Sequence, residues 1–154
     1  MLRLIFFMII IISTVFSKDT RYGLAYSPGI MEFEEWDGDI DFNTISFKYA
    51  DSMSSSSEWG VFYELDTEEG DFEILSSYVR SYLQNDVFRP FLELDVGVIL
   101  GDGDTEPFIG GKLGGLYKID ESNAVEVSLR YMIFATDYQE YYVTSINLGY
   151  LFSI

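Results

Sequence analysis

From Tyr22 to the end of the chain, apolar residues recur at every second position rather than at every third or fourth. A period of two places successive side chains on opposite sides of an extended strand, whereas a helix requires a period near 3.6. The last segment is the clearest case, because one face carries Tyr142, Thr144, Ile146, Leu148, Tyr150, Phe152 and Ile154. The pattern predicts a chain built of β-strands.

The alternating segments number eight, and each is separated from the next by Gly, Asn, Asp or Ser residues that favour turns. We expect strands near residues 20–30, 42–52, 58–67, 72–84, 87–101, 107–119, 124–136 and 141–154. An even number of strands about ten residues long is typical of an antiparallel up-and-down barrel. The sequence therefore predicts an all-β fold with eight antiparallel strands.

The first 17 residues have a different character. Met1–Ser17 carries one positive charge and then an apolar run, Leu4–Phe16, of about 13 residues, shorter than the roughly 20 that a membrane-spanning helix needs. Val15 and Ser17 are small enough for a signal-peptidase site. We interpret residues 1–17 as a cleavable signal peptide and residues 18–154 as the barrel domain, with an uncleaved N-terminal anchor as the alternative.

Charge on the less apolar strand faces indicates which side of the barrel meets lipid. The whole chain has 9 basic and 26 acidic residues, a net charge of −17, which argues against a nucleic-acid partner. The less apolar faces instead carry a nearly neutral set of charges: Arg21, Lys48, Glu64, Arg80, Glu93, Asp95, Lys112, Glu126 and Arg130. Balanced charges suit ion pairs in a narrow lumen, so we predict a transmembrane barrel with its apolar face outward. A soluble lipid-binding barrel is the alternative.

Most of the acidic residues lie in alternate connections between the expected strands. If the N-terminus is periplasmic, the outward connections are 27–42, 66–73, 101–106 and 137–140; they hold 16 of the 26 acidic residues and no Lys or Arg. We expect such a rim to meet anionic lipopolysaccharide through bridging divalent cations. Alternation of Met31, Phe33 and Glu35 predicts a first hairpin that projects beyond the membrane and could bind proteins by strand addition.

Catalytic and cofactor chemistry has little support in this sequence. The chain has no His and no Cys, which excludes His-dependent triads, thiol catalysis and Cys-ligated zinc. Asp102, Asp104 and Glu106 could offer oxygen ligands to Ca²⁺, but we interpret them as a solvated acidic loop, and we expect no cofactor. We interpret Glu93 and Asp95 as ion-pair partners of lumen bases such as Arg80, Lys112 or Arg130 rather than as an acid–base pair.

The C-terminus carries a motif of polar, glycine, aromatic and hydrophobic residues at Asn147, Gly149, Phe152 and Ile154. It resembles the C-terminal targeting strand of bacterial outer-membrane β-barrel proteins, although that family most often ends in Phe. The mature chain is similar in architecture to small eight-stranded barrels of the OmpX, OmpW and OmpA-membrane-domain kind. This resemblance implies a location in the bacterial outer membrane and recognition by the barrel assembly machinery.

These observations predict a non-enzymatic barrel whose lumen is plugged by ion pairs and whose role is structural or in surface interactions. A narrow, porin-like channel for small solutes is the alternative function, and the two differ in whether the lumen conducts.

Overall fold

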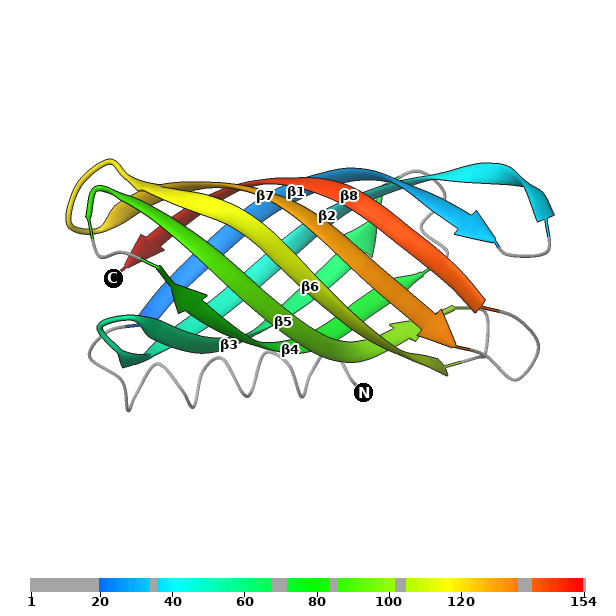
Figure 1. Ribbon diagram of the computed structural model, residues 1–154, viewed down its shortest axis with the longest axis horizontal. Helices are drawn as coiled ribbons and strands as arrows, with labels where there is room; N and C mark the ends of the chain where they lie inside the picture. Colours follow the sequence, from blue (N-terminus) through cyan, green and yellow to red (C-terminus); the bar gives the residue numbers. More distant parts are fainter. Residues whose placement is uncertain are drawn as a thin grey trace.

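The computed structural model describes residues 20–33, 36–67, 72–83, 86–101, 105–135 and 140–153. They form a closed barrel of eight antiparallel strands in sequence order (Figure 1). The strands are β1 (Thr20–Phe33), β2 (Trp36–Ser54), β3 (Ser57–Asp66), β4 (Glu73–Tyr82), β5 (Phe88–Leu100), β6 (Thr105–Lys118), β7 (Asn123–Ala135) and β8 (Glu140–Ser153). Among these residues no helix is long and apolar enough to cross a membrane. The predicted signal peptide lies outside the described residues.

Each strand pairs with the next, and β1 closes the barrel against β8, with Leu24 opposite Tyr150. The predicted all-β, up-and-down architecture is confirmed. The first hairpin is longer than the expected segments, because β1 and β2 remain paired as far as Phe33 and Trp36. Figure 1 shows this hairpin, in blue and cyan, extending past the ends of the other strands.

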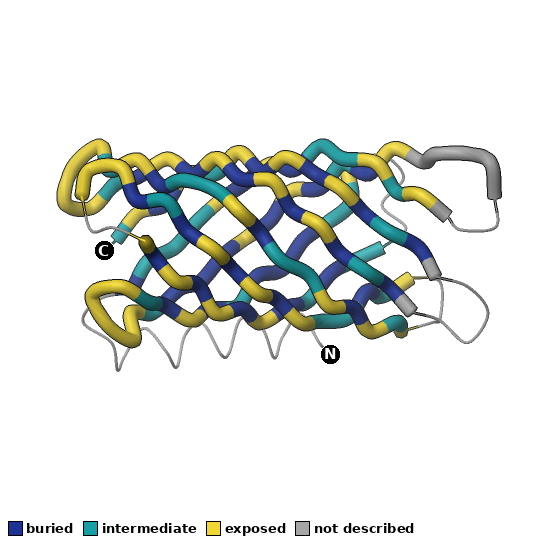
Figure 2. Tube along the Cα trace, in the orientation of Figure 1, coloured by how far each residue is buried: buried dark blue, intermediate teal, exposed yellow. Residues whose placement is uncertain are grey.

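The apolar face of the strands points outward. Leu94, Val127 and Tyr150 are 64%, 52% and 45% exposed, and Figure 2 shows exposed and buried residues alternating along the strands. The predicted orientation, with the apolar face outside, is therefore correct. An apolar exterior is the surface that a barrel presents to lipid, whereas a soluble barrel turns that face inward.

Two apolar layers lie inside the barrel, one toward each end. The layer nearer the long connections includes Phe42, Phe62, Ile74, Phe108 and Phe134. The layer nearer the short turns consists of the following five residues: Tyr82, Phe91, Leu116, Ala124 and Leu151. Buried charged side chains also occupy the interior, and the guanidinium of Arg130, for example, lies over the Phe62 ring. The bore is thus filled by side chains along much of its length, as expected for eight strands.

Candidate functional site

The structure places all nine charged residues named from the sequence on inward-facing strand positions. Eight of them are buried, and the side chain of Arg21 is 15% exposed. Two further residues, Glu58 and Arg89, are also buried charges of the interior. The sequence carried a signal for both, because Glu58 has the same alternation phase as Phe62 and Glu64, and Arg89 that of Phe91 and Glu93. The interior set is therefore six basic and five acidic side chains.

The first ion-pair cluster centres on Arg80 of β4. Its Nε donates to Glu93 Oε2 at 2.8 Å, and its Nη1 lies 2.9 Å from Glu126 Oε2 and 3.4 Å from Glu58 Oε1. Lys48 Nζ donates to Glu126 at 3.2 Å, and Lys112 Nζ lies 3.0 Å from Glu93 Oε1. The cluster joins β2, β4, β5, β6 and β7, with Glu58 contributed by β3.

The second cluster centres on Arg130 of β7. Its Nη1 donates to Glu64 of β3 at 2.9 Å, and its Nη2 donates to Asp95 of β5 at 2.6 Å. The Phe62 ring lies with its centroid 4.6 Å from the guanidinium. Glu93 and Asp95 thus belong to different clusters, each neutralised by its own base. Buried carboxylates held in this way accept charge-assisted hydrogen bonds from the cations.

The remaining candidates lie partly outside the described residues. Within the described ranges no group of three or more His, Cys, Asp or Glu residues could hold a metal ion. Asp102 and Asp104 lie outside the described residues, and Glu106 lies in β6. In the C-terminal motif, Asn147 accepts a hydrogen bond from Ser27 Oγ at 2.7 Å, Gly149 pairs with Ala25 and Phe152 points outward; Ile154 is outside the described residues.

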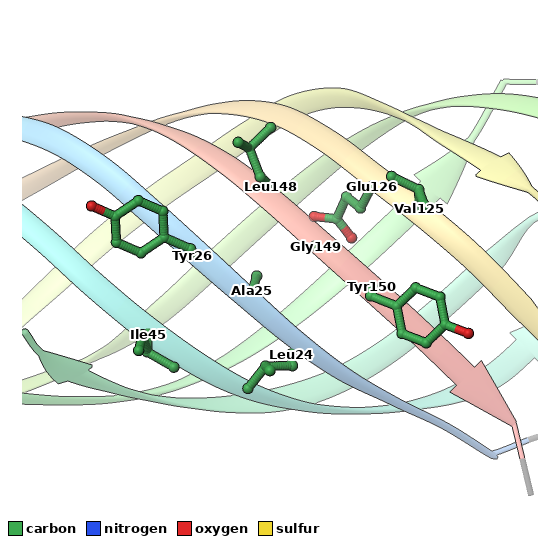
Figure 3. A pocket seen from close by; sticks show the side chains of 9 residues that line it. All are labelled: Leu24, Ala25, Tyr26, Ile45, Val125, Glu126, Leu148, Gly149 and Tyr150. Atoms are coloured by element: carbon green, nitrogen blue, oxygen red, sulfur yellow. The ribbon is translucent and has the colours of Figure 1, made fainter.

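A shallow apolar depression of about 550 Å³ lies on the outside of the barrel, over the seam where β1 meets β8. Figure 3 shows Tyr26 and Tyr150 on either side of it, with Leu24, Ile45 and Leu148 between and around them. The small residues Ala25 and Gly149 and the lumen residue Glu126 also line it. This depression belongs to the apolar exterior rather than to the lumen.

Comparison with solved structures gives the same architecture. The chain is similar to Neisserial surface protein A, with a TM-score of 0.73, 11% identity, and coverage of 88% of this chain and 97% of that chain. It is also similar to the outer membrane protein OprG from Pseudomonas aeruginosa, with a TM-score of 0.52, 14% identity, and coverage of 90% and 98%. The outer membrane enzyme PagL matches with a TM-score of 0.52, 14% identity, and coverage of 86% and 99%.

No protein-family model and no curated protein sequence matches the chain. The closed eight-stranded topology, the apolar exterior and the neutralised interior together define a small β-barrel of the outer-membrane type. Within this class, the likeness to Neisserial surface protein A extends over nearly the whole length of both chains. The fold and exterior support the location predicted from the sequence, the bacterial outer membrane.

Proposed function

We propose that the chain is a non-enzymatic outer-membrane barrel with a closed lumen and a role at the cell surface. The main observation for a closed lumen is that the bore is filled: buried apolar side chains and the ion pairs of Arg80 and Arg130 occupy it together. An ion that crossed would have to displace buried side chains that already satisfy one another. A channel would instead need a continuous polar path lined by water.

The fold alone does not decide between enzyme and non-enzyme, since PagL is an outer membrane enzyme on a similar barrel. The side chains of this chain favour the non-enzymatic role. It has no His or Cys to serve as base or nucleophile, and its buried carboxylates at Glu64, Glu93 and Glu126 are paired with bases.

The first hairpin supports a surface-interaction role. On the β3 side, the pairing of β2 begins at Thr44, so within the described chain residues 39–42 pair only with β1. An unpaired strand edge can accept a strand from another protein. The acidic outward connections predicted from the sequence would surround this edge, and divalent cations would bridge them to lipopolysaccharide.

Planar-bilayer recording tests the closed lumen. We expect the refolded protein to give no sustained conductance above the baseline of the bare bilayer. The matched variant Arg80→Ala/Glu93→Ala, which removes a base and an acid together and keeps the net charge, should admit water and ions more readily. Sustained conductance by the unaltered protein would establish the porin-like alternative and reject the closed lumen.

Thermal unfolding tests the cation bridges. In bilayers that contain lipopolysaccharide, addition of Mg²⁺ or Ca²⁺ should raise the midpoint of unfolding, whereas in bilayers of neutral lipid it should not. An equal response in both bilayers would reject a bridge between the acidic rim and lipopolysaccharide.

A further inference from the structure

A polar cavity of about 510 Å³ lies at the end of the barrel that carries the short turns. Its lining includes Arg21, Ser54, Ser55, Ser57, Tyr82 and Arg89. Ser54 ends β2, Ser55 lies in the exposed turn and Ser57 begins β3, while Tyr82 and Arg89 are buried. The cavity therefore leads from the surroundings to a buried guanidinium.

Within the part of the chain that the structure describes, Arg89 has no carboxylate partner, unlike the other interior cations. Arg89 is 6% exposed, and its Nη2 donates a hydrogen bond to the Ser55 carbonyl oxygen at 2.9 Å. No ion pair joins Arg89 to an acidic residue in the described parts of the chain. The Nε of Arg89 is buried and has no hydrogen-bond partner among the described residues. Burying a charge without a counter-charge is costly. An anion bound in the cavity would therefore stabilise this guanidinium.

The Tyr82 ring packs against the guanidinium of Arg89, and both residues line the cavity. The guanidinium carbon lies 3.8 Å from the centroid of the Tyr82 ring, a stacking distance that fixes the plane of the group. Arg21 lies 5.8 Å from the same ring and is paired with Glu58. The pair of Arg21 and Glu58 is neutral, so Arg89 gives the cavity its excess positive charge.

The serines add hydrogen-bond donors at the cavity mouth. Ser54 Oγ and Ser57 Oγ lie 2.7 Å apart, and the Ser56 N–H donates to Ser54 Oγ at 3.2 Å. A planar fork of N–H groups beside hydroxyl donors matches the tetrahedral oxygens of phosphate. The volume of about 510 Å³ exceeds that of one phosphate and leaves room for a group attached to it.

We propose that this cavity binds a phosphate group, held through the Nη groups of Arg89 with the serine hydroxyls completing its shell. The cavity lies at the end where β1 begins and β8 finishes, which the sequence places on the periplasmic side. Inorganic phosphate and the phosphodiester of a lipid headgroup share the required chemistry. This site is separate from the surface role proposed above and is tested independently of it.

The experiment uses the full chain refolded in nonionic detergent, with the backbone amides of Ser55 and Ser57 followed by NMR. Sodium phosphate is titrated at constant ionic strength, and dihexanoylphosphatidylglycerol is titrated in a second arm. We expect saturable shifts of both amides. Saturation by phosphate identifies a free anion as the ligand, and saturation by the lipid alone identifies a headgroup. Absence of a saturable shift in both arms overturns the proposal.

Charge-matched variants locate the site. Arg89→Gln should weaken binding by at least about tenfold, since it removes the charge that strengthens the hydrogen bonds to the anion. Lys118→Gln removes a positive charge near the same end without lining the cavity and should change affinity by less than about twofold. Arg89→Lys keeps the positive charge and is the second test variant if Arg89→Gln does not fold. It should bind phosphate several-fold more weakly than the unaltered protein because it lacks the planar fork of N–H groups. Unchanged affinity in the folded Arg89 variants overturns the assignment.

Discussion

At the scale of single residues, Arg130 shows how the interior depends on mutual neutralisation. Replacing it by Met would leave Glu64 and Asp95 buried without their base. Removing one partner of a buried ion pair typically costs about 3–5 kcal/mol. We expect Arg130→Met to lower the free energy of unfolding, measured by denaturant titration in lipid vesicles, by about that amount.

A compensated variant serves as the control for that prediction. Arg130→Met combined with Glu64→Gln and Asp95→Asn removes the whole cluster and its uncompensated charges. This triple variant should recover most of the lost stability, because neutral amides cost less to bury than carboxylates. If the triple variant is as unstable as Arg130→Met, then packing around Arg130 rather than charge accounts for the loss.

Asp120 provides a pH-dependent contact outside the membrane-spanning strands. Its side chain accepts hydrogen bonds from Asn123 Nδ2 at 2.9 Å and from the backbone N–H groups of Ser122 and Asn123 at 2.8 Å. These bonds, that from the Asn123 side chain foremost, lower the pKa of Asp120. The contact therefore stabilises the folded turn above the unfolded pKa of about 3.9, and this contribution is lost as the pH falls through the lower folded value.

The Asp120 interaction can be measured by following its carboxyl carbon by NMR as the pH is lowered. The pKa should lie below the ordinary Asp value in the unaltered protein and move toward it in Asn123→Ala, which removes the largest cause of the shift. An identical titration curve in both proteins would show that Asn123 does not set this pKa.

At the scale of strands, glycines on β6 let neighbouring strands approach closely. A Cβ added at Gly114 would lie 2.4 Å from Ser128 Cβ and 2.5 Å from the Val127 carbonyl oxygen. A Cβ at Gly111, on the outer face, would meet no atom closer than 3.2 Å. Gly114→Ala should therefore destabilise the barrel by about 1–3 kcal/mol, while Gly111→Ala should cost much less. Equal free energies of unfolding for the two variants would contradict this packing argument.

Strand phase was predictable from sequence, whereas ion-pair partners were not. Alternation alone decides which face a residue occupies, so it placed Glu93 and Asp95 inside and could have placed Glu58 and Arg89 there too. Pairing depends on distances across the bore: Arg130 on β7 reaches Glu64 on β3, although these strands are not neighbours in the sheet. No local pattern encodes that approach.

The length of the first hairpin was also underestimated from residue types. Residues 36–41 contain Gly38 and three Asp residues, which favour loops. The structure keeps them in β2 because the ladder with β1 continues, with Met31 opposite Ile40 and Glu32 opposite Asp39. Backbone pairing between β1 and β2 therefore outweighs the loop propensity of the Gly and Asp residues. Residue propensities alone do not predict such pairing.

At the scale of the whole molecule, the cost of placing a charge on the apolar exterior should depend on its depth in the bilayer. Leu94 lies midway along β5 and Val87 lies just before that strand; both side chains are exposed. Arg on the lipid face of a barrel costs about 2–4 kcal/mol at the bilayer midplane and about 0–1 kcal/mol near an interface. We expect Leu94→Arg to lower the free energy of unfolding in lipid vesicles by the larger amount and Val87→Arg by the smaller. The two substitutions add the same charge and differ in depth, so a solvent-facing exterior would give equally small effects for both. Equal small costs would therefore show that this apolar surface does not face lipid.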